Sequence, residues 1–392
     1  MQYRYDNKNE PISLLGYGCM RFTRNGAKID YDKAERELLH AIKNGVNYFD
    51  TAYIYPGSEE LLGEIFSRNN VRKDIKIATK LPQYYIKSRA AIDKYFNEHL
   101  SRLQTDYIDY YLMHMLTDIA SWEKLVNLGI IDWIKEKKAL GQIKRIGFSF
   151  HGNTEMFLKI LDAYDWEFCQ IQYNYMDEHS QGGRKGLEYA HSKNIPVIIM
   201  EPLRGGKLVD LLPDKAKTLI KNNARNYSAA EWSFRWLMQQ PGVTCVLSGM
   251  NSIEMLNENI RIASEVRINE FTDDDYALIS KIKTSINENV KVNCTGCNYC
   301  TPCPVGVDIP GVFRCYNVYH TDGWFSALRE YVQTTVLRKK PSVASACIKC
   351  GVCKSHCPQS IDIPTEIANA SKKLDVLPVR IAQWGVQRFK LW

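Results

Sequence analysis

Eight cysteines stand in two short runs near the end of the 392-residue chain. The first run, NCTGCNYCTPCP, contains Cys294, Cys297, Cys300 and Cys303. The second run, CIKCGVCKSHCP, contains Cys347, Cys350, Cys353 and Cys357. The start, MQYRYDNKNEP, lacks the apolar core of a signal peptide, so such regular spacing predicts metal binding rather than disulfides. Thiolates in this pattern are typical of iron–sulfur clusters, which carry single electrons.

The second run, C-x2-C-x2-C-x3-C-P, has the ligand spacing of bacterial two-cluster ferredoxins, in which the fourth cysteine of each run binds the other cluster. By that rule one [4Fe-4S] cluster takes Cys294, Cys297, Cys300 and Cys357, and the other takes Cys347, Cys350, Cys353 and Cys303. Zinc is the alternative, but sites with four cysteines favour two separated C-x2-C pairs. The isolated Cys315, His320 and His356 are interpreted as structural or surface residues.

A second set of reactive side chains lies far upstream, each at or just after the end of an apolar run. It consists of Asp50 and Tyr55 in FDTAYIYPGSEELLG, Lys80 in IATK and His114 in YYLMH. Tyrosine, with a pKa near ~10, is a weak acid at neutral pH, and a nearby ammonium group lowers that pKa. We expect Asp50 to hold Lys80, Lys80 to acidify Tyr55, and Tyr55 to protonate a carbonyl oxygen while His114 orients it. The alternative is a salt bridge and packed aromatics without catalysis.

The elements that would position these residues alternate between short β-rich runs and helical patterns. The expected strands are 14–18, 46–52, 75–80, 107–114, 143–150, 168–174, 196–202 and 244–250. Between them, apolar residues recur at intervals of three and four, and most of these helical patterns begin with Ser, Asp or Asn. Eight alternations over about 250 residues predict an α/β fold, the (β/α)8 TIM barrel, whose reactive groups gather where strands end. An open doubly wound sheet is the alternative, although GYG at 16–18 is no dinucleotide fingerprint.

Beyond the barrel, a polar helix is expected over 272–289, and short helices surround the two cysteine runs. We expect a barrel domain over 1–290 and a small, mainly α-helical dicluster domain over 291–392.

From Lys291 onward the chain has 13 Lys and Arg and 6 Asp and Glu, so the whole net charge of +7 lies there. Anionic clusters explain this basic excess more closely than a nucleic acid does. No stretch reaches the ~20 apolar residues of a membrane span, so a cytoplasmic protein without membrane or nucleic-acid partners is expected.

The motif D-T-A-x-x-Y-x-x-S-E-E-x-L-G, followed by the Lys and His strand ends, resembles the aldo-keto reductase superfamily over roughly residues 1–265. The resemblance implies a barrel that binds an extended NAD(P)H and reduces carbonyl compounds by hydride transfer. With the cysteine runs, the arrangement resembles a subgroup fused to a C-terminal ferredoxin-type 2[4Fe-4S] domain.

The resemblance also implies cofactor contacts, carried over residue by residue. They are Ser149 and Gln170 at the nicotinamide carboxamide, Pro202, Leu203, Gly205 and Lys207 in the loop over the pyrophosphate, Glu258 and Asn259 at the adenine end, and Gly18 and Arg21 elsewhere in the cofactor site. The sequence departs from the family pattern in two places. At the nicotinamide, the family's usual Asn is Phe150 here, and its usual stacking aromatic is Met200. Near the adenosine phosphate, the family's usual basic and hydroxyl residues align with Gly249, Met250 and Met255. NAD and NADP therefore both stay open, and FMN stays an alternative occupant of a phosphate-binding barrel.

Three hypotheses follow, because hydride transfer moves two electrons whereas each cluster accepts one. In the first, the clusters exchange electrons with a flavin or with an external ferredoxin- or flavodoxin-like carrier while the barrel interconverts a carbonyl compound and its alcohol. In the second, an ordinary NAD(P)H-dependent carbonyl reductase carries structural clusters. In the third, the barrel is the ligand-binding module of a redox or iron sensor. The candidate residues for the apolar wall of the substrate pocket are Trp122, Tyr175 and Met176.

Overall fold

The computed structural model describes residues 1–26, 28–288, 290–294, 296, 300–338, 340–357 and 361–389, and Cys297 lies outside these ranges. Contacts divide the chain into two compact units. The first comprises Met1–Val209 and Asn223–Tyr276, and the second comprises Asp210–Asn222 and Ala277–Trp392. The boundary between the units after Tyr276 falls within the helix Asp273–Asn287, and the internal segment Asp210–Asn222 belongs to the second unit. The domain boundary expected near residue 290 stays a prediction.

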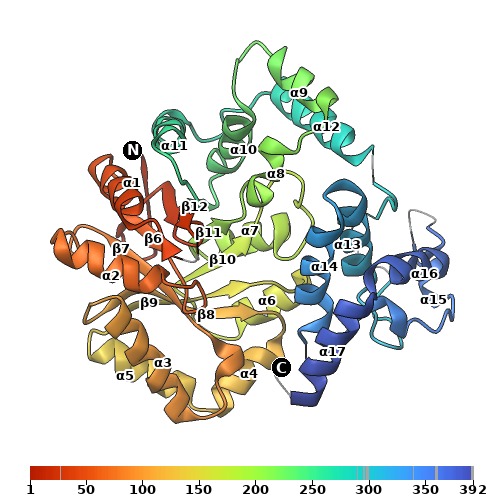
Figure 1. The fold of residues 1–392 in the computed structure, drawn as a ribbon, viewed down its shortest axis with the longest axis horizontal. Helices are drawn as coiled ribbons and strands as arrows, with labels where there is room; N and C mark the ends of the chain where they lie inside the picture. Colours follow the sequence, from red (N-terminus) through yellow and green to blue (C-terminus); the bar gives the residue numbers. More distant parts are fainter. Residues whose placement is uncertain are drawn as a thin grey trace. The chain divides into compact units, whose positions relative to one another are not determined.

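Eight parallel strands close into a barrel at the centre of the first unit (Figure 1). In chain order they are β3 (Leu15–Gly18), β6 (Tyr48–Asp50), β7 (Lys76–Leu81), β8 (Ile108–Leu116), β9 (Ile143–Phe150), β10 (Phe168–Gln172), β11 (Val197–Met200) and β12 (Val243–Ser248). Each expected strand is present, and β12 pairs with β3 to complete the ring. The TIM barrel is therefore confirmed, and its strand ends meet at one mouth.

Helices surround the strands of the first unit. They are α1 (Tyr31–Lys43), α2 (Ser58–Arg68), α3 (Arg89–Arg102), α4 (Ile119–Asn127), α5 (Ile130–Ala139), α6 (Thr154–Asp162), α7 (Gly183–Ser192), α8 (Lys207–Asp210, whose last residue falls to the second unit), α10 (Ala229–Met238) and α11 (Ile253–Glu265). Several begin at the capping residues that the sequence indicates. The side chains of Asp30, Ser88 and Asn153, for example, each accept a hydrogen bond from the backbone three residues later. Such caps satisfy amides that the helix leaves unpaired and fix where it starts.

A short hairpin covers the amino ends of the barrel strands. Strand β1 (Tyr3–Tyr5) pairs with β2 (Pro11–Ser13), and a second small hairpin joins β4 (Arg24–Asn25) to β5 (Lys28–Ile29). Next to β1, the Asp6 carboxylate accepts hydrogen bonds from the Tyr110 hydroxyl at 2.9 Å and from Arg145 Nε at 2.7 Å. Both partners lie near the starts of β8 and β9. The hairpin therefore closes this end of the barrel and leaves the carboxyl ends as the mouth.

The second unit is mainly helical, as expected. Its elements are α9 (Asp214–Lys221), most of α12 (Asp273–Asn287), α13 (Ile309–Thr321), α14 (Trp324–Tyr331), a π-helical turn (Val332–Val336), a 3-10 turn (Ala344–Ala346), α15 (Val352–Ser355), α16 (Ile363–Leu374) and α17 (Leu377–Phe389). None of the helices in the described ranges is long and apolar enough to cross a membrane.

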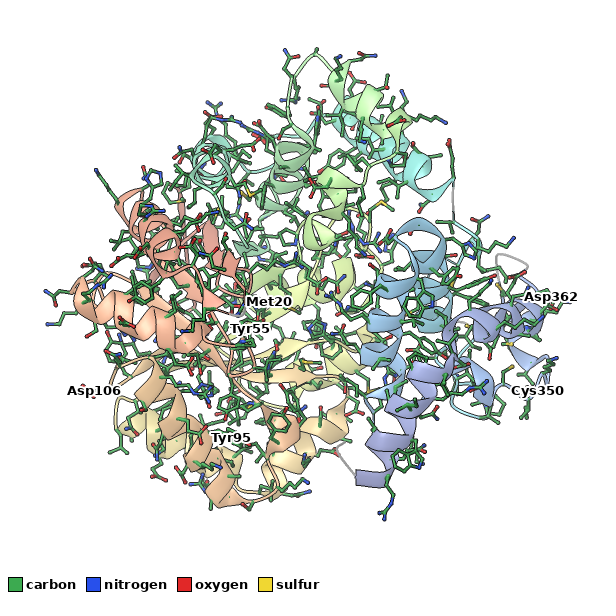
Figure 2. All side chains as sticks on the ribbon, in the orientation of Figure 1. Met20, Tyr55, Tyr95, Asp106, Cys350 and Asp362 are labelled. Atoms are coloured by element: carbon green, nitrogen blue, oxygen red, sulfur yellow. The ribbon has the colours of Figure 1, made fainter. Side chains whose placement is uncertain are left out.

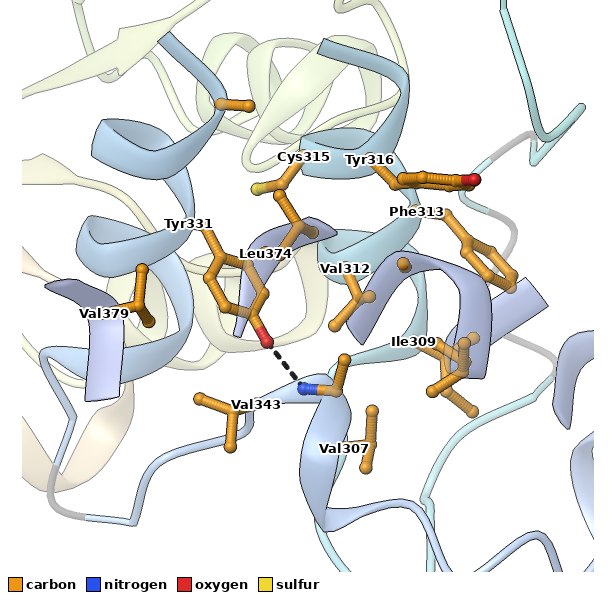
Figure 3. Packing of buried hydrophobic residues seen from close by; sticks show 14 of the residues in the cluster. Val307, Ile309, Val312, Phe313, Cys315, Tyr316, Tyr331, Val343, Leu374 and Val379 are labelled. Atoms are coloured by element: carbon orange, nitrogen blue, oxygen red, sulfur yellow. Dashed lines mark hydrogen bonds between the residues drawn. The ribbon is translucent and has the colours of Figure 1, made fainter. Parts of the chain in front are cut away.

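The second unit has its own apolar core, built from α13, α14 and α16 (Figure 3). At its centre the Tyr331 hydroxyl accepts a hydrogen bond from the backbone amide of Ala344 at 2.6 Å and donates one to Asp375 Oδ1 at 2.8 Å. The other oxygen of Asp375 accepts a hydrogen bond from the amide of Ser345 at 2.7 Å. This buried network holds the segment that leads directly into the second cysteine run. Cys315 is buried in the same core, with its sulfur 3.7 Å from Thr334 Oγ1, as expected of a packed thiol.

Candidate active site

A buried ion pair lies at the centre of the barrel mouth. Lys80, at the end of β7, places Nζ 2.7 Å from Asp50 Oδ1 and 2.6 Å from the carbonyl oxygen of Thr51. Lys80 and Asp50 expose only 1% and 3% of their surfaces, so water does little to screen their attraction. Burial raises the pKa of Asp50, against the opposing effect of the Lys80 ammonium group. The expected contact between these two side chains is present.

Tyr55 lies half-buried in the loop after β6, with the Lys80 ammonium 5.4 Å from the centre of its ring (Figure 2). The expectation that Lys80 lowers the pKa of Tyr55 is wrong for this structure. Burial raises that pKa, and the carboxylates of Asp50 and Glu201 raise it further. The main physical reason is burial, which disfavours the charged phenolate, and the Asp50 carboxylate, 2.7 Å from Lys80, offsets the opposing effect of the ammonium group. Tyr55 is therefore held in its protonated form.

His114, in β8, is the third member of the group. Burial, and then the charge of Lys80, lower the pKa of His114 well below its usual value and keep the ring neutral. Its Nδ1 is buried and has no hydrogen-bond partner among the described residues. A neutral ring with an unused nitrogen can form a hydrogen bond with a bound molecule.

Two side chains predicted to contact a nicotinamide carboxamide lie beside the ion pair. Gln170 Nε2 donates to Asp50 Oδ2 at 3.1 Å, and Gln170 Oε1 is buried without a partner among the described residues. Ser149 Oγ accepts a hydrogen bond from the amide of Met115 at 2.9 Å, which leaves its own proton to donate. One free acceptor and one free donor fit the amide group of a nicotinamide.

The predicted pyrophosphate loop, 202–207, lies beside Arg21, another of the predicted cofactor contacts. Arg21 Nη1 donates to the carbonyl oxygen of Gly205 at 3.1 Å, and a Cβ at Gly205 would lie 2.8 Å from Arg21 Nη2. Gly205 also has a φ of +72°, a left-handed conformation that favours glycine, and a side chain here would displace the end of Arg21. Gly249 contacts the same arginine, and Gly18 lies against the carbonyl of Ser248. Of the other predicted contacts, Pro202 and Leu203 precede Gly205 in the same loop and Lys207 begins α8.

The predicted adenine contacts lie side by side on α11 but face different partners. Glu258 Oε1 accepts a hydrogen bond from Ser228 Oγ at 2.6 Å. Asn259 is buried, and its amide donates to Ser248 Oγ at 3.2 Å. Asn259 therefore links α11 to the end of β12.

Two of the three candidate residues for the wall of the substrate pocket are buried against other aromatic side chains. Trp122 is buried in α4, with its ring 4.7 Å from that of Trp166, just before β10 begins. Tyr175 is buried against Trp236 of α10, with their rings 6.4 Å apart. Large aromatic side chains contribute most when they fill a core, and the role of these two rings in a pocket wall stays a prediction. Met176 is half-buried in the same loop.

Three further residues of the mouth were not predicted. Tyr84, in the 3-10 turn Gln83–Tyr85 after β7, lies with its ring centre 6.1 Å from that of His114 and the two rings tilted by 47°. Cys19 is buried next to Asp50 and has its pKa raised by burial and by that carboxylate. Glu201 directly follows β11. All three come just after a strand, so the position that pointed to Asp50 and His114 could also have indicated them.

The cysteine runs meet around a cavity in the second unit. It is lined by apolar residues of α13 and α16 and by five thiols, Cys300, Cys303, Cys347, Cys350 and Cys353. Burial raises the pKa of Cys353, and the thiols of Cys347, Cys350 and Cys303 contribute to the rise, which places Cys303 of the first run with the second.

This arrangement fits the crossed ligand set, in which Cys303 binds the cluster of the second run. No three His, Cys, Asp or Glu side chains in the described ranges converge on a single metal ion. Thiols spaced around a cavity suit a four-iron cluster, which binds one thiolate at each iron.

Comparison with known proteins identifies both parts of the chain. The model of the aldo/keto reductase family matches residues 14–284, and the model of the 4Fe-4S dicluster domain matches residues 293–361. An uncharacterized oxidoreductase of Bacillus subtilis, YqkF, is 28% identical over 306 residues, covering 70% of this chain and 94% of its own. An aldose reductase of Encephalitozoon cuniculi is 30% identical over 302 residues, covering 71% and 92%.

A solved structure has the same barrel. The aldo/keto reductase of Klebsiella pneumoniae in complex with NADP and acetate aligns with a TM-score of 0.59 and 23% identity, covering 71% of this chain and 94% of its own. At this identity the likeness shows the fold alone.

Proposed function

Because this chain belongs to the aldo/keto reductase family, we propose that it is an iron–sulfur oxidoreductase that interconverts a carbonyl compound and its alcohol while its clusters relay single electrons. The observation that carries the proposal is a protonated Tyr55 beside the buried Lys80–Asp50 pair, in a chain that also brings Cys303 to the thiols of the second run. The first feature suits proton transfer and the second suits electron transfer.

The reaction needs a proton at the carbonyl oxygen, and Tyr55 is the donor. Its hydroxyl stays protonated until the oxygen becomes a strong base during hydride transfer. The Lys80 ammonium, fixed by Asp50, then stabilises the phenolate that remains. His114, kept neutral, forms a hydrogen bond with the same oxygen and orients the carbonyl group.

Ser149 and Gln170 would hold a nicotinamide, and Arg21 with the Gly205 loop would hold phosphates. When bound, a nicotinamide supplies hydride, a flavin mononucleotide passes electrons singly or in pairs, and each iron–sulfur cluster carries one electron. Whether the barrel binds NAD, NADP or FMN determines how two-electron transfer in the barrel can be coupled to single-electron transfer at the clusters.

Electrons would leave or enter the second unit at Cys350. Among the described cysteines it is the exposed one (Figure 2). Ile348, two residues earlier, is 64% exposed, and the nearby Lys349 and Lys354 are also exposed, Lys354 in an ion pair with Asp362. An apolar patch with basic neighbours suits an acidic electron carrier such as a ferredoxin- or flavodoxin-like protein.

A second candidate is an NAD(P)H-dependent carbonyl reductase in which the clusters only stabilise the fold. The free acceptor at Gln170 and donor at Ser149 favour it, because they fit a nicotinamide directly.

Anaerobic purification followed by iron analysis and identification of bound small molecules separates the two candidates. About eight irons per chain with one flavin per chain would support the electron relay. The same iron without flavin, with aldehyde reduction by NADPH that does not change when the clusters are reduced, would support structural clusters. A chain that reduces no aldehyde under either condition would refute carbonyl chemistry.

A further inference from the structure

Ser58, the first residue of α2, joins the segments that follow two neighbouring barrel strands. Its hydroxyl donates a hydrogen bond at 2.8 Å to the carbonyl oxygen of Cys19, just after β3. It also lies 2.8 Å from the hydroxyl of Thr51, just after β6. A hydroxyl has one proton to give and a carbonyl oxygen can only accept, so Thr51 donates to Ser58 and Ser58 donates to Cys19. All three residues are buried, so water does not compete for these hydrogen bonds.

The Thr51 end of this hydrogen-bond chain leads to the buried ion pair. The carbonyl oxygen of Thr51 accepts from Lys80 Nζ at 2.6 Å, and Asp50 Oδ1 accepts from the same nitrogen at 2.7 Å. These two acceptors take two of the three protons of the ammonium group and thereby fix the direction of the third. Because Lys80 Nζ lies 5.4 Å from the centre of the Tyr55 ring, a shift of the Thr51 carbonyl group would turn the ammonium group relative to the phenol.

The backbone of Ser58 holds the loop that carries Tyr55. The amide of Ser58 donates to the carbonyl oxygen of Tyr55 at 3.0 Å, and the amide of Tyr55 donates to that of Ala52 at 3.0 Å. Two consecutive turns therefore span the loop from Thr51 to Ser58. Through its side chain Ser58 fixes the residue that binds Lys80, and through its backbone it fixes the proton donor.

We propose that Ser58 is a positioning residue, which acts through the Thr51 carbonyl group to direct the Lys80 ammonium group toward the phenolate formed on Tyr55. This inference rests on the proposed function, because the phenolate forms only if Tyr55 donates its proton. Misplacement of a reacting group by ~1 Å can lower a rate by ~100-fold. Ser58 acts on Lys80 only through Thr51, so we expect a smaller loss, of about tenfold in kcat.

The test compares the full-length, cluster-loaded protein with Ser58→Ala, which removes the hydroxyl alone. Reduction of 4-nitrobenzaldehyde with NADH and with NADPH gives kcat and KM, and fluorescence quenching gives the dissociation constant of each dinucleotide. We expect kcat to fall about tenfold while KM and the dissociation constants stay nearly unchanged, because the groups proposed to bind substrate and cofactor are all kept.

Two variants of Thr51 show whether the hydroxyl contact carries the effect. Thr51→Val removes the hydroxyl and should also lower kcat, whereas Thr51→Ser keeps the hydroxyl and should keep kcat near the native value. The double variant Ser58→Ala/Thr51→Val should lose about as much as Ser58→Ala alone, because both changes remove the same contact. Losses that simply multiply would overturn the proposed route through Thr51.

The matched control is Ser13→Ala, at the other end of the same two strands. Ser13 is buried, and its hydroxyl donates to the carbonyl oxygen of Leu15 at 2.7 Å and accepts from the amide of Asn47 at 3.0 Å. It therefore links the starts of β3 and β6 as Ser58 links their ends. Both alanine variants should lower the melting temperature by similar amounts, but only Ser58→Ala should lower kcat. An equal loss of kcat in both would overturn the inference, because the effect would then be one of stability.

The exchange of the Lys80 ammonium protons with water gives a second readout without turnover. Isotope-labelled lysine makes these protons observable by NMR, and their signal is the one that is missing from Lys80→Met. Exchange should be faster in Ser58→Ala and unchanged in Ser13→Ala. A native exchange rate in Ser58→Ala would overturn the inference even if kcat falls. If the native protein reduces no aldehyde but exchange accelerates as expected, the proposed function fails and the positioning of Lys80 by Ser58 stands.

Discussion

Replacing Lys80 with methionine tests whether the buried ion pair acts as the structure indicates. Methionine fills a similar volume but has no charge, so Asp50 would keep a buried carboxylate without its partner. Removal of one member of a buried pair typically costs ~3–5 kcal/mol of stability, because the remaining charge is not solvated. Lys80→Met should therefore lower the melting temperature of the barrel by roughly 10 °C.

The loss of stability should depend on pH in a defined direction. Burial raises the pKa of Asp50, and without Lys80 less opposes that rise. The folded variant therefore holds its proton more tightly than the unfolded chain, in which aspartate has a pKa of about 3.9. Below about pH 4 both states are protonated and the penalty disappears. As pH rises through the folded pKa of Asp50, the difference from the native protein should grow to its full size.

The matched control is the double variant Asp50→Asn/Lys80→Met, which removes both charges. It should recover most of the stability and lose the pH dependence, while carbonyl reduction stays low in both variants. Unfolding can be followed by the fluorescence of the barrel tryptophans, such as Trp122, Trp133 and Trp232, which lie in the first unit. A single variant as stable as the native protein at pH 7, or an equal loss at pH 4 and pH 7, would refute the reasoning.

Three further outcomes are expected. Tyr55→Phe should lower carbonyl reduction by about 10²- to 10⁴-fold without weakening dinucleotide binding measured by fluorescence quenching, and an active variant would show that another group donates the proton. Burial tends to raise the pKa of Glu59, but its contacts with His99, Thr79 and Arg102 hold that pKa below the usual value. The ionised Glu59 therefore stabilises the folded chain above about pH 4, and this stabilisation is lost as the pH falls through the folded pKa. Glu59→Gln should thus flatten the acid side of a plot of urea midpoint against pH, and an unchanged slope would argue against that contribution. Cys303→Ser should remove about four of about eight irons, whereas Cys315→Ser should retain them all, and equal loss in both would contradict the ligand assignment.

Much of the barrel could be predicted because its signals are local. A polar residue at the carboxyl end of an apolar barrel strand lies at the mouth, and this rule led to the prediction of Asp50, Lys80 and His114 as site residues. Capping residues such as Asp30 and Ser88 mark helix starts within four residues of sequence. Each of these inferences depends on the order of neighbouring residues alone.

Properties that depend on distant residues could not be predicted in the same way. The pKa of Tyr55 rises mainly because the packed fold buries the phenol, and then because the carboxylates of Asp50 and Glu201 come from other strand ends. Trp122 and Tyr175 stand in loops or helices beside the expected pocket, but their rings turn toward tertiary partners. Only the packed fold decides between a core and a pocket for a large aromatic side chain.

The second unit is assembled from two separate stretches of chain, which constrains how it can be transplanted. The chain leaves the first unit at Asp210, forms α9 in the second, and returns at Asn223. Lys215 of α9 pairs there with Glu288, just after α12. A chimera built by one crossover near residue 290 would carry the cysteine runs but leave their α9 segment behind. Grafting this dicluster unit onto another barrel therefore requires two insertions, and a gene fusion at a single point would not reproduce it.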